Sequence, residues 1–208
     1  MNFNDFKNKV PQLKAIELGG LKAQFKLAPK MRLNYDADKI AASNPRKAAV
    51  LALFYPSKQG ETCFLLTQRA HYKGVHSAQI SFPGGKIDET DGNLQKTALR
   101  ETFEEVGVPE TAIHIIRELT AVYIAPSNFL ATPFLGFANQ KPEFNTNYEV
   151  AETIEVLASD LLNDANITSV KRNTSLREDI EVPCFKLGGY IVWGATAMIL
   201  SEIKELLT

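Results

Sequence analysis

Short apolar runs separated by turn residues occupy the first half of the chain, a pattern typical of β-strands. Residues 48–55 (AAVLALFY) and 62–67 (TCFLLT) are two such runs, and residues 56–60 between them contain proline and glycine. Two apolar runs around a short loop predict an antiparallel hairpin. A third strand is expected at 79–82, ending at Pro83-Gly84-Gly85, because proline and paired glycines interrupt a strand.

Residues 93–106 (NLQKTALRETFEEV) predict the clearest helix of the chain. Asn93 or Asp91 is suited to cap its first turn, and Gly107 is suited to end it in the left-handed conformation. The apolar side chains of this helix are expected to supply its core contact: Leu99, Phe103 and Val106.

Both ends of the chain predict helices. Residues 3–10 carry apolar side chains at helical spacing, and residues 194–207 form a longer apolar pattern that should pack on the sheet as a closing helix. Strands dominate the middle, so the sequence predicts an α+β fold with a mixed sheet between helices. The further strand candidates are residues 113–123, 132–138, 151–157, 167–170 and 180–185.

Composition narrows the class of protein. The 208 residues are 45% hydrophobic and 23% charged, which suits one globular domain with at most a modest extension. A formal net charge of -1 argues against a surface devoted to nucleic acid or anionic membrane. Cys63 and Cys184 lie far apart in apolar runs and are expected to be buried reduced thiols. No signal peptide or membrane-length apolar run is found, so a cytoplasmic location is expected.

The candidate chemistry lies in the central helix. Glu101, Glu104 and Glu105 stand at i, i+3 and i+4 and therefore share one helix face. Like charges at this spacing repel, and the helix dipole disfavours anions near a C-terminus. A divalent cation such as Mg²⁺ or Mn²⁺ would remove both penalties. The alternative is an ordinary solvated acidic face, but the glycine turn at Gly84-Gly85, which allows close backbone approach, favours the cation site.

The run 84–108 (GGKIDETDGNLQKTALRETFEEVGV) resembles the Nudix box. Asp91 stands where most members of that family have glutamate, one additional residue separates it from Arg100, and Thr102 occupies a usually apolar position. The aspartate and the longer spacing are features of the coenzyme A pyrophosphatase branch. The residues that match the general box are Gly85, Arg100, Glu101, Glu104, Glu105, Gly107 and Val108.

A second segment resembles the same branch. Residues 65–85 (LLTQRAHYKGVHSAQISFPGG) are similar to its upstream signature, although Gly74 replaces an arginine and Ala78 replaces a glycine. Residues 190–200 also resemble its C-terminal segment. The resemblance therefore implies a Nudix-type α/β/α sandwich with a mixed central sheet over residues 47–208, with residues 1–46 as an N-terminal extension packing on it.

The resemblance implies a metal-dependent diphosphatase. By this likeness Glu101, Glu105 and the Gly85 carbonyl hold Mg²⁺ or Mn²⁺, Glu104 binds a further ion, and Arg100 orients the carboxylates. The general base varies across the family. Glu149 or Glu152, outside the helix, is a candidate for it.

The implied substrate is coenzyme A or a derivative, cut to 4′-phosphopantetheine and adenosine 3′,5′-bisphosphate. Arg69, Lys73 and His76 are candidates to bind its phosphates, with plain surface charge as the alternative for each. Two other functions stay open: hydrolysis of another nucleoside diphosphate derivative such as ADP-ribose or NADH, and a non-catalytic nucleotide-sensing module. We expect a small-molecule nucleotide partner, with no nucleic acid and no membrane. The sequence leaves the oligomeric state open, a homodimer included.

Overall fold

The computed structural model describes residues 1–30, 32, 36–70, 79–172 and 180–208. Within these ranges a mixed sheet of eight strands forms the centre of the fold. Its central strand, β1 (Arg46–Pro56), runs parallel to β7 (Phe129–Phe137) and antiparallel to β2 (Thr62–Arg69) and β4 (Gly84–Lys86). The other strands are β3 (Ile80–Ser81), β5 (His114–Glu118), β6 (Val122–Ile124) and β8 (Val150–Leu157).

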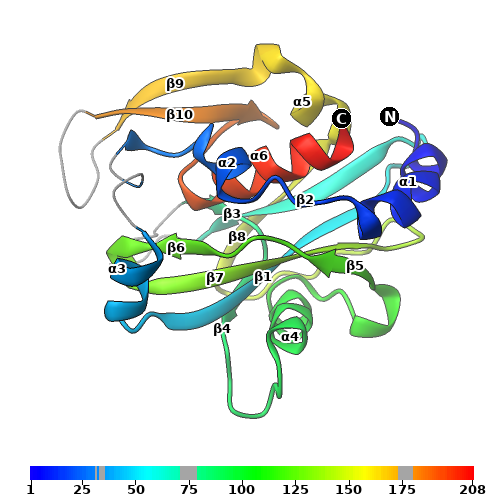
Figure 1. The fold of residues 1–208 in the computed structure, drawn as a ribbon. Coiled ribbons are helices and arrows are strands. Elements are labelled where there is room, and N and C mark those ends of the chain that lie inside the picture. Colours follow the sequence, from blue (N-terminus) through cyan, green and yellow to red (C-terminus); the bar gives the residue numbers. More distant parts are fainter. Residues whose placement is uncertain (31, 33–35, 71–78, 173–179) are drawn as a thin grey trace.

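A smaller antiparallel sheet stands apart from the central one and contains β9 (Ile167–Arg172), β10 (Ile180–Leu187) and β11 (Tyr190–Trp193). Figure 1 shows α4 on one side of the central sheet, with α2, α6, β9 and β10 on the other. The α-helices are α1 (Phe3–Ala15), α2 (Gly20–Phe25), α3 (Ala37–Ala42), α4 (Leu94–Val106), α5 (Ala158–Leu162) and α6 (Ala195–Leu207). Short 3-10 turns occupy Glu110–Ala112, Ala125–Ser127 and Asp164–Asn166.

Strict alternation along β1 and β2 builds a core on each side of the sheet. Leu51, Leu53 and Leu65 face α4, whereas Phe54 and Phe64 face the opposite layer. These side chains are fully buried. The run that predicted the hairpin is therefore apolar at nearly every position because both of its faces are covered.

The N-terminal segment is part of the layer opposite α4. Phe6 of α1 is fully buried and stacks on Phe54, with ring centroids 5.0 Å apart. Arg117 of β5 donates to the Leu13 carbonyl oxygen at 3.0 Å and to the Ile16 carbonyl oxygen at 2.6 Å. These bonds satisfy carbonyl groups that the last turn of α1 leaves without intrahelical partners.

A buried carboxylate joins this segment to the closing helix. Glu202 of α6 is fully buried, and its carboxylate oxygens accept hydrogen bonds from the backbone N–H and the hydroxyl of Thr120, at 3.2 and 2.6 Å. They also accept from the Gly20 N–H at 2.9 Å and from the Gln24 side-chain amide at 3.2 Å. Glu202 thus connects α2, the β5–β6 connection and α6.

The sequence predicted this architecture well. The mixed sheet between helices and the β1–β2 hairpin are confirmed. The central helix is confirmed as well, with Asn93 rather than Asp91 as the capping side chain and Gly107 left-handed at its end. Cys63 and Cys184 are buried free thiols. In the described part of the chain, no helix is both long enough and apolar enough to span a membrane.

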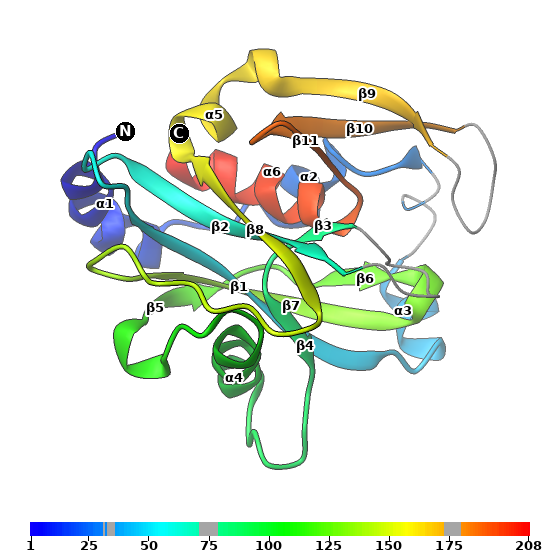
Figure 2. The same ribbon diagram turned by 180° about the vertical axis from the view of Figure 1, so that it is seen from behind.

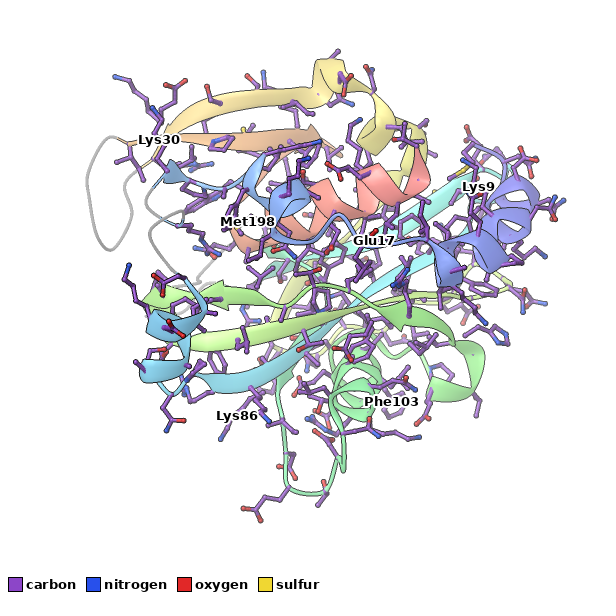
Figure 3. The ribbon with its side chains drawn as sticks, in the orientation of Figure 1. Lys9, Glu17, Lys30, Lys86, Phe103 and Met198 are labelled. Atoms are coloured by element: carbon purple, nitrogen blue, oxygen red, sulfur yellow. The ribbon has the colours of Figure 1, made fainter. Side chains whose placement is uncertain are left out.

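Two expectations were wrong in detail. The strand expected at 113–123 is divided into β5 and β6, because Pro133 of β7 has no N–H for the ladder and Thr120 donates its N–H to Glu202. The third strand does end before Pro83, as β3, but the glycine pair then forms a further short strand, β4, that was not predicted. Phe103 is 56% exposed on α4 (Figure 3), so Leu99 and Val106 contact the core without it. In addition, α2 and α3 were not predicted.

Candidate active site

The glycine turn brings β4 against both β1 and α4. Gly84 has a φ of 151°, and a Cβ there would lie 2.6 Å from the Val50 Cα. A Cβ on Gly85 would lie 2.5 Å from both carboxylate oxygens of Glu101. With the Glu101 side chain in this position, a glycine at 85 leaves room between the backbone and this carboxylate.

The three glutamates of α4 have different surroundings. Glu105 is buried, and its carboxylate accepts the Gly84 N–H at 3.0 Å. Glu101 is partly buried, whereas the Glu104 side chain is 52% exposed. Burial raises the pKa of Glu105 to about 7 and also raises the pKa of Glu101. An unfavourable environment for two neighbouring anions is therefore built into this helix face.

Arg100 is fixed by a buried aspartate. Its guanidinium donates to both carboxylate oxygens of Asp91, at 2.7 and 3.0 Å, and this pairing holds the pKa of the Asp91 carboxyl well below its usual range. The same guanidinium donates to Glu101 at 2.9 Å and to Glu104 at 3.0 Å. Arg100 thus links the loop before α4 to two of the glutamates on the helix.

Asp91 belongs to this network, a role that was not predicted from the sequence. Besides Arg100, its carboxylate accepts the Thr97 hydroxyl and the Asp88 N–H, both at 2.8 Å. The sequence did mark this position, because Asp91 stands where most Nudix proteins have glutamate. A shorter side chain reaches Arg100 here because the loop folds back on the first turn of α4.

Glu149 comes to the same place from the other side. It precedes β8, and its carboxylate lies 3.5 Å from the guanidinium of Arg69, which in turn lies 3.8 Å from the Glu105 carboxylate. The other candidate base, Glu152, points to the opposite layer and accepts the Tyr190 hydroxyl. The structure therefore brings Glu149, and not Glu152, toward the glutamates of α4. Figure 2 shows β8 passing in front of β2, with one end near β4.

The other two predicted phosphate-binding residues, Lys73 and His76, lie outside the described residues, as do Gly74 and Ala78. A hollow of about 510 Å³ opens beyond the C-terminal end of α4, lined by Gly107, His114 and the 138–145 segment among others. None of the α4 glutamates lines it in the part of the chain that is described. We therefore locate the candidate chemistry at the carboxylates and not in this hollow.

The donor set at the carboxylates suits a hard divalent cation. Glu101, Glu105 and the Gly85 backbone supply oxygen ligands, the type that such ions prefer, and the missing Cβ of Gly85 leaves space beside Glu101. As the described side chains stand, no three acidic, histidine or cysteine groups are already spaced to hold an ion. Arg100, Arg69 and the Gly84 N–H hold the carboxylates instead, so side-chain rotation would have to accompany binding.

The fold and the site together define an α/β/α protein with a glutamate cluster behind a glycine turn. The model of the NUDIX domain family matches residues 45–172. The chain belongs to the Nudix family. This match and the relatives below identify it as an enzyme of the Nudix diphosphatase class, and enzymes of this family generally use divalent cations.

Two similar proteins are named "Uncharacterized Nudix hydrolase NudL", from Yersinia pestis (strain Pestoides F) and Yersinia pseudotuberculosis (serotype O:1b, strain IP 31758). Each is 32% identical over 172 residues, which cover 79% of this chain and 81% of the relative. The same fold occurs in a MutT/nudix family protein from Enterococcus faecalis (15% identity, TM-score 0.53, 85% and 71% of the two chains). It also occurs in the NUDIX domain of Shewanella oneidensis NrtR complexed with ADP ribose (19% identity, TM-score 0.51, 85% and 96%).

Proposed function

We propose that this chain hydrolyses the pyrophosphate bond of coenzyme A or its derivatives with Mg²⁺ or Mn²⁺, giving 4′-phosphopantetheine and adenosine 3′,5′-bisphosphate. The observation that carries the hydrolytic part is the approach of Glu101, Glu105 and Glu149 to one another around the Gly84-Gly85 turn. The choice of substrate rests on the likeness of residues 65–85 to the coenzyme A pyrophosphatase signature.

In this proposal Gly85, Glu101 and Glu105 hold the first cation, and Glu104 contributes to a further one. When bound, such ions neutralise the negative charge of adjacent phosphates and make water a better nucleophile near neutral pH. Arg100 keeps Glu101 in place through the hydrogen bond at 2.9 Å. Glu149 accepts the proton of the attacking water, whose oxygen forms the new bond to phosphorus as the anhydride bond breaks.

Residues 1–46 are proposed to be an extension that packs on a catalytic domain formed by 47–208. The family match begins at residue 45, which supports this division. The buried Phe6 and the bonds from Arg117 to α1 support the packing.

Purified protein incubated with coenzyme A and Mg²⁺ is expected to release adenosine 3′,5′-bisphosphate, detected by chromatography. ADP-ribose and NADH should be assayed beside it, because Gly74 and Ala78 depart from the branch signature and the NrtR domain is a neighbour complexed with ADP ribose. Turnover of another diphosphate without this product would refute the choice of substrate. Binding without turnover of any diphosphate would instead favour a nucleotide sensor.

Saturating Mg²⁺ or Mn²⁺ is expected to raise the melting temperature. An ion at a hundredfold its Kd stabilises the folded state by about 2.7 kcal/mol, which for a chain of this size corresponds to roughly 5–10 °C. Calorimetry with and without a chelator measures the shift, and the double substitution Glu101→Gln and Glu105→Gln should abolish it. A wild-type protein that neither binds the ions nor melts higher with them has no such site.

A further inference from the structure

Arg69 lies between two carboxylates of the candidate site. One terminal nitrogen of its guanidinium is 3.8 Å from Glu105, and the other is 3.5 Å from Glu149. The Arg69 side chain is 27% exposed, while the Glu149 side chain is 43% exposed. Both terminal nitrogens of the guanidinium therefore face protein carboxylates.

The pairing of β2 with β8 places Arg69 next to Glu149. Along β2, Leu65 faces α4, and alternation puts Arg69 on the same face. The β2–β8 register runs regularly to Gln68 opposite Glu152 and then shifts, so that Arg69 stands opposite Val150. The extra residue in β8 reverses its alternation, a known way to redirect side chains near active sites. Glu152 pairs with Gln68 before the shift and therefore faces away from α4, whereas Val150, beyond the shift, packs in the core on the α4 side.

The backbone of the turn before β8 is held independently of Arg69's side chain. The N–H groups of Asn145 and Asn147 donate to the Val106 and Glu105 carbonyl oxygens, at 3.0 and 3.2 Å. Ala70 donates its N–H to the Glu149 carbonyl oxygen at 2.8 Å. These bonds fix the backbone at Glu149. The direction of its side chain therefore depends on the side-chain interactions of Glu149.

The charges around Glu149 determine how its side chain rotates. Glu101 and Glu105 both repel the Glu149 carboxylate, and a half-exposed side chain relieves such repulsion by turning to solvent. The positively charged guanidinium of Arg69, which lies between Glu105 and Glu149, offsets this repulsion and keeps the two side chains close. Resting on the proposed function, we infer that Arg69 is a positioning residue that holds the Glu149 carboxylate beside Glu105, ready to take the proton of the attacking water.

The kinetic test is a cycle of Arg69→Met, Glu149→Gln and both together, assayed on the best diphosphate substrate with Mg²⁺. We expect Arg69→Met to lower kcat by roughly 10- to 100-fold, in the range seen when a supporting partner is lost, with KM within about twofold. The double variant should be no slower than Glu149→Gln, since Arg69 acts through that residue. Arg69→Lys should restore part of kcat. Arg172→Met, on β9 of the other sheet, is the matched control and should be unchanged.

A raised KM with unchanged kcat would overturn the inference, because it would indicate a contact with substrate. Multiplicative effects of the two substitutions, or full activity of Glu149→Gln, would overturn it as well. The crystal structure of Arg69→Met is a test that needs no turnover. We expect Glu149 turned away from Glu105 on an unchanged backbone, and a carboxylate that stays in place would refute the positioning role. Inactivity of the wild-type chain would refute the proposed function alone. If Arg69→Met does not fold, Arg69→Gln, which also removes the positive charge, takes its place in both tests.

Discussion

Replacing Glu105 by glutamine is expected to lower kcat by about a thousandfold while the protein stays folded. Glu105 is the buried member of the α4 cluster, and a neutral amide there removes one anionic ligand of the proposed cation site. A loss of about 4 kcal/mol of transition-state stabilisation is of the size expected for a metal contribution. The side chain keeps its shape, and its oxygen is still able to accept the Gly84 N–H. Steady-state kinetics with Mg²⁺, together with thermal melts, measures both effects.

The matched control is Glu61→Gln, which makes the same chemical change at an exposed glutamate between β1 and β2. Its activity should equal that of the wild type. A Glu105→Gln protein that is stable and retains full turnover would remove the carboxylate cluster from the mechanism. An unfolded variant would assign Glu105 a structural role instead, so circular dichroism has to accompany the kinetics.

The elements with local signals were the predictable ones. Helix α4 begins at an asparagine cap and ends at a left-handed glycine, and both signals are carried by residues adjacent to the helix ends. The β1–β2 hairpin was predicted for the same reason, because a five-residue turn separates two apolar runs. The short α2 has a glycine, Gly19, at its capping position and therefore no side-chain cap. Its stability comes from packing on α6 and from Glu202, which are remote in sequence.

The buried face of α4 shows where pattern reasoning fails. Its buried side chains include Thr102 and Glu105, while Phe103 faces solvent. The Thr102 hydroxyl donates to the Ala98 carbonyl oxygen at 2.7 Å, so a polar residue is buried there without an unsatisfied group. Placing the Glu105 carboxylate against the β4 backbone rotates the helix and exposes the phenylalanine. Hydrophobicity alone places Leu99 and Val106 correctly but puts Phe103 on the buried face.

The choice between Glu149 and Glu152 also required the structure. The two residues are three positions apart, so regular alternation puts them on opposite faces of a strand but does not tell which face is toward α4. The answer depends on the register between β8 and β2, in which Glu152 stands opposite Gln68 on the face away from α4, and that pairing joins segments about 80 residues apart. Long-range register of this kind leaves no local mark in the sequence.

Replacing Glu202 by alanine is expected to reduce the free energy of unfolding by about 3–5 kcal/mol, the sum of several lost hydrogen bonds to a buried carboxylate. Two backbone N–H groups, of Gly20 and Thr120, would lose their acceptor in the interior. Urea denaturation measures the loss, which corresponds to a fall in Tm of roughly 10 °C. Because these donors belong to α2 and the β5–β6 connection, α2 should also detach more readily, and trypsin should cut faster after Lys22 in that helix.

Two further variants test whether the loss of stability comes from the hydrogen bonds of Glu202 or from any substitution in α6. Glu202→Gln should lower the free energy of unfolding by less than Glu202→Ala does, since one acceptor oxygen remains. It should still destabilise the protein, because each carboxylate oxygen of Glu202 accepts hydrogen bonds from two donors. An amide nitrogen in place of either oxygen would face a backbone N–H. The second variant is Glu205→Ala. Glu205 lies one turn further along α6, and its partly exposed side chain pairs with Lys26. Such a surface ion pair contributes at most about 1 kcal/mol. If Glu202→Ala is no less stable than Glu205→Ala, the buried carboxylate does not hold the N-terminal segment to the domain.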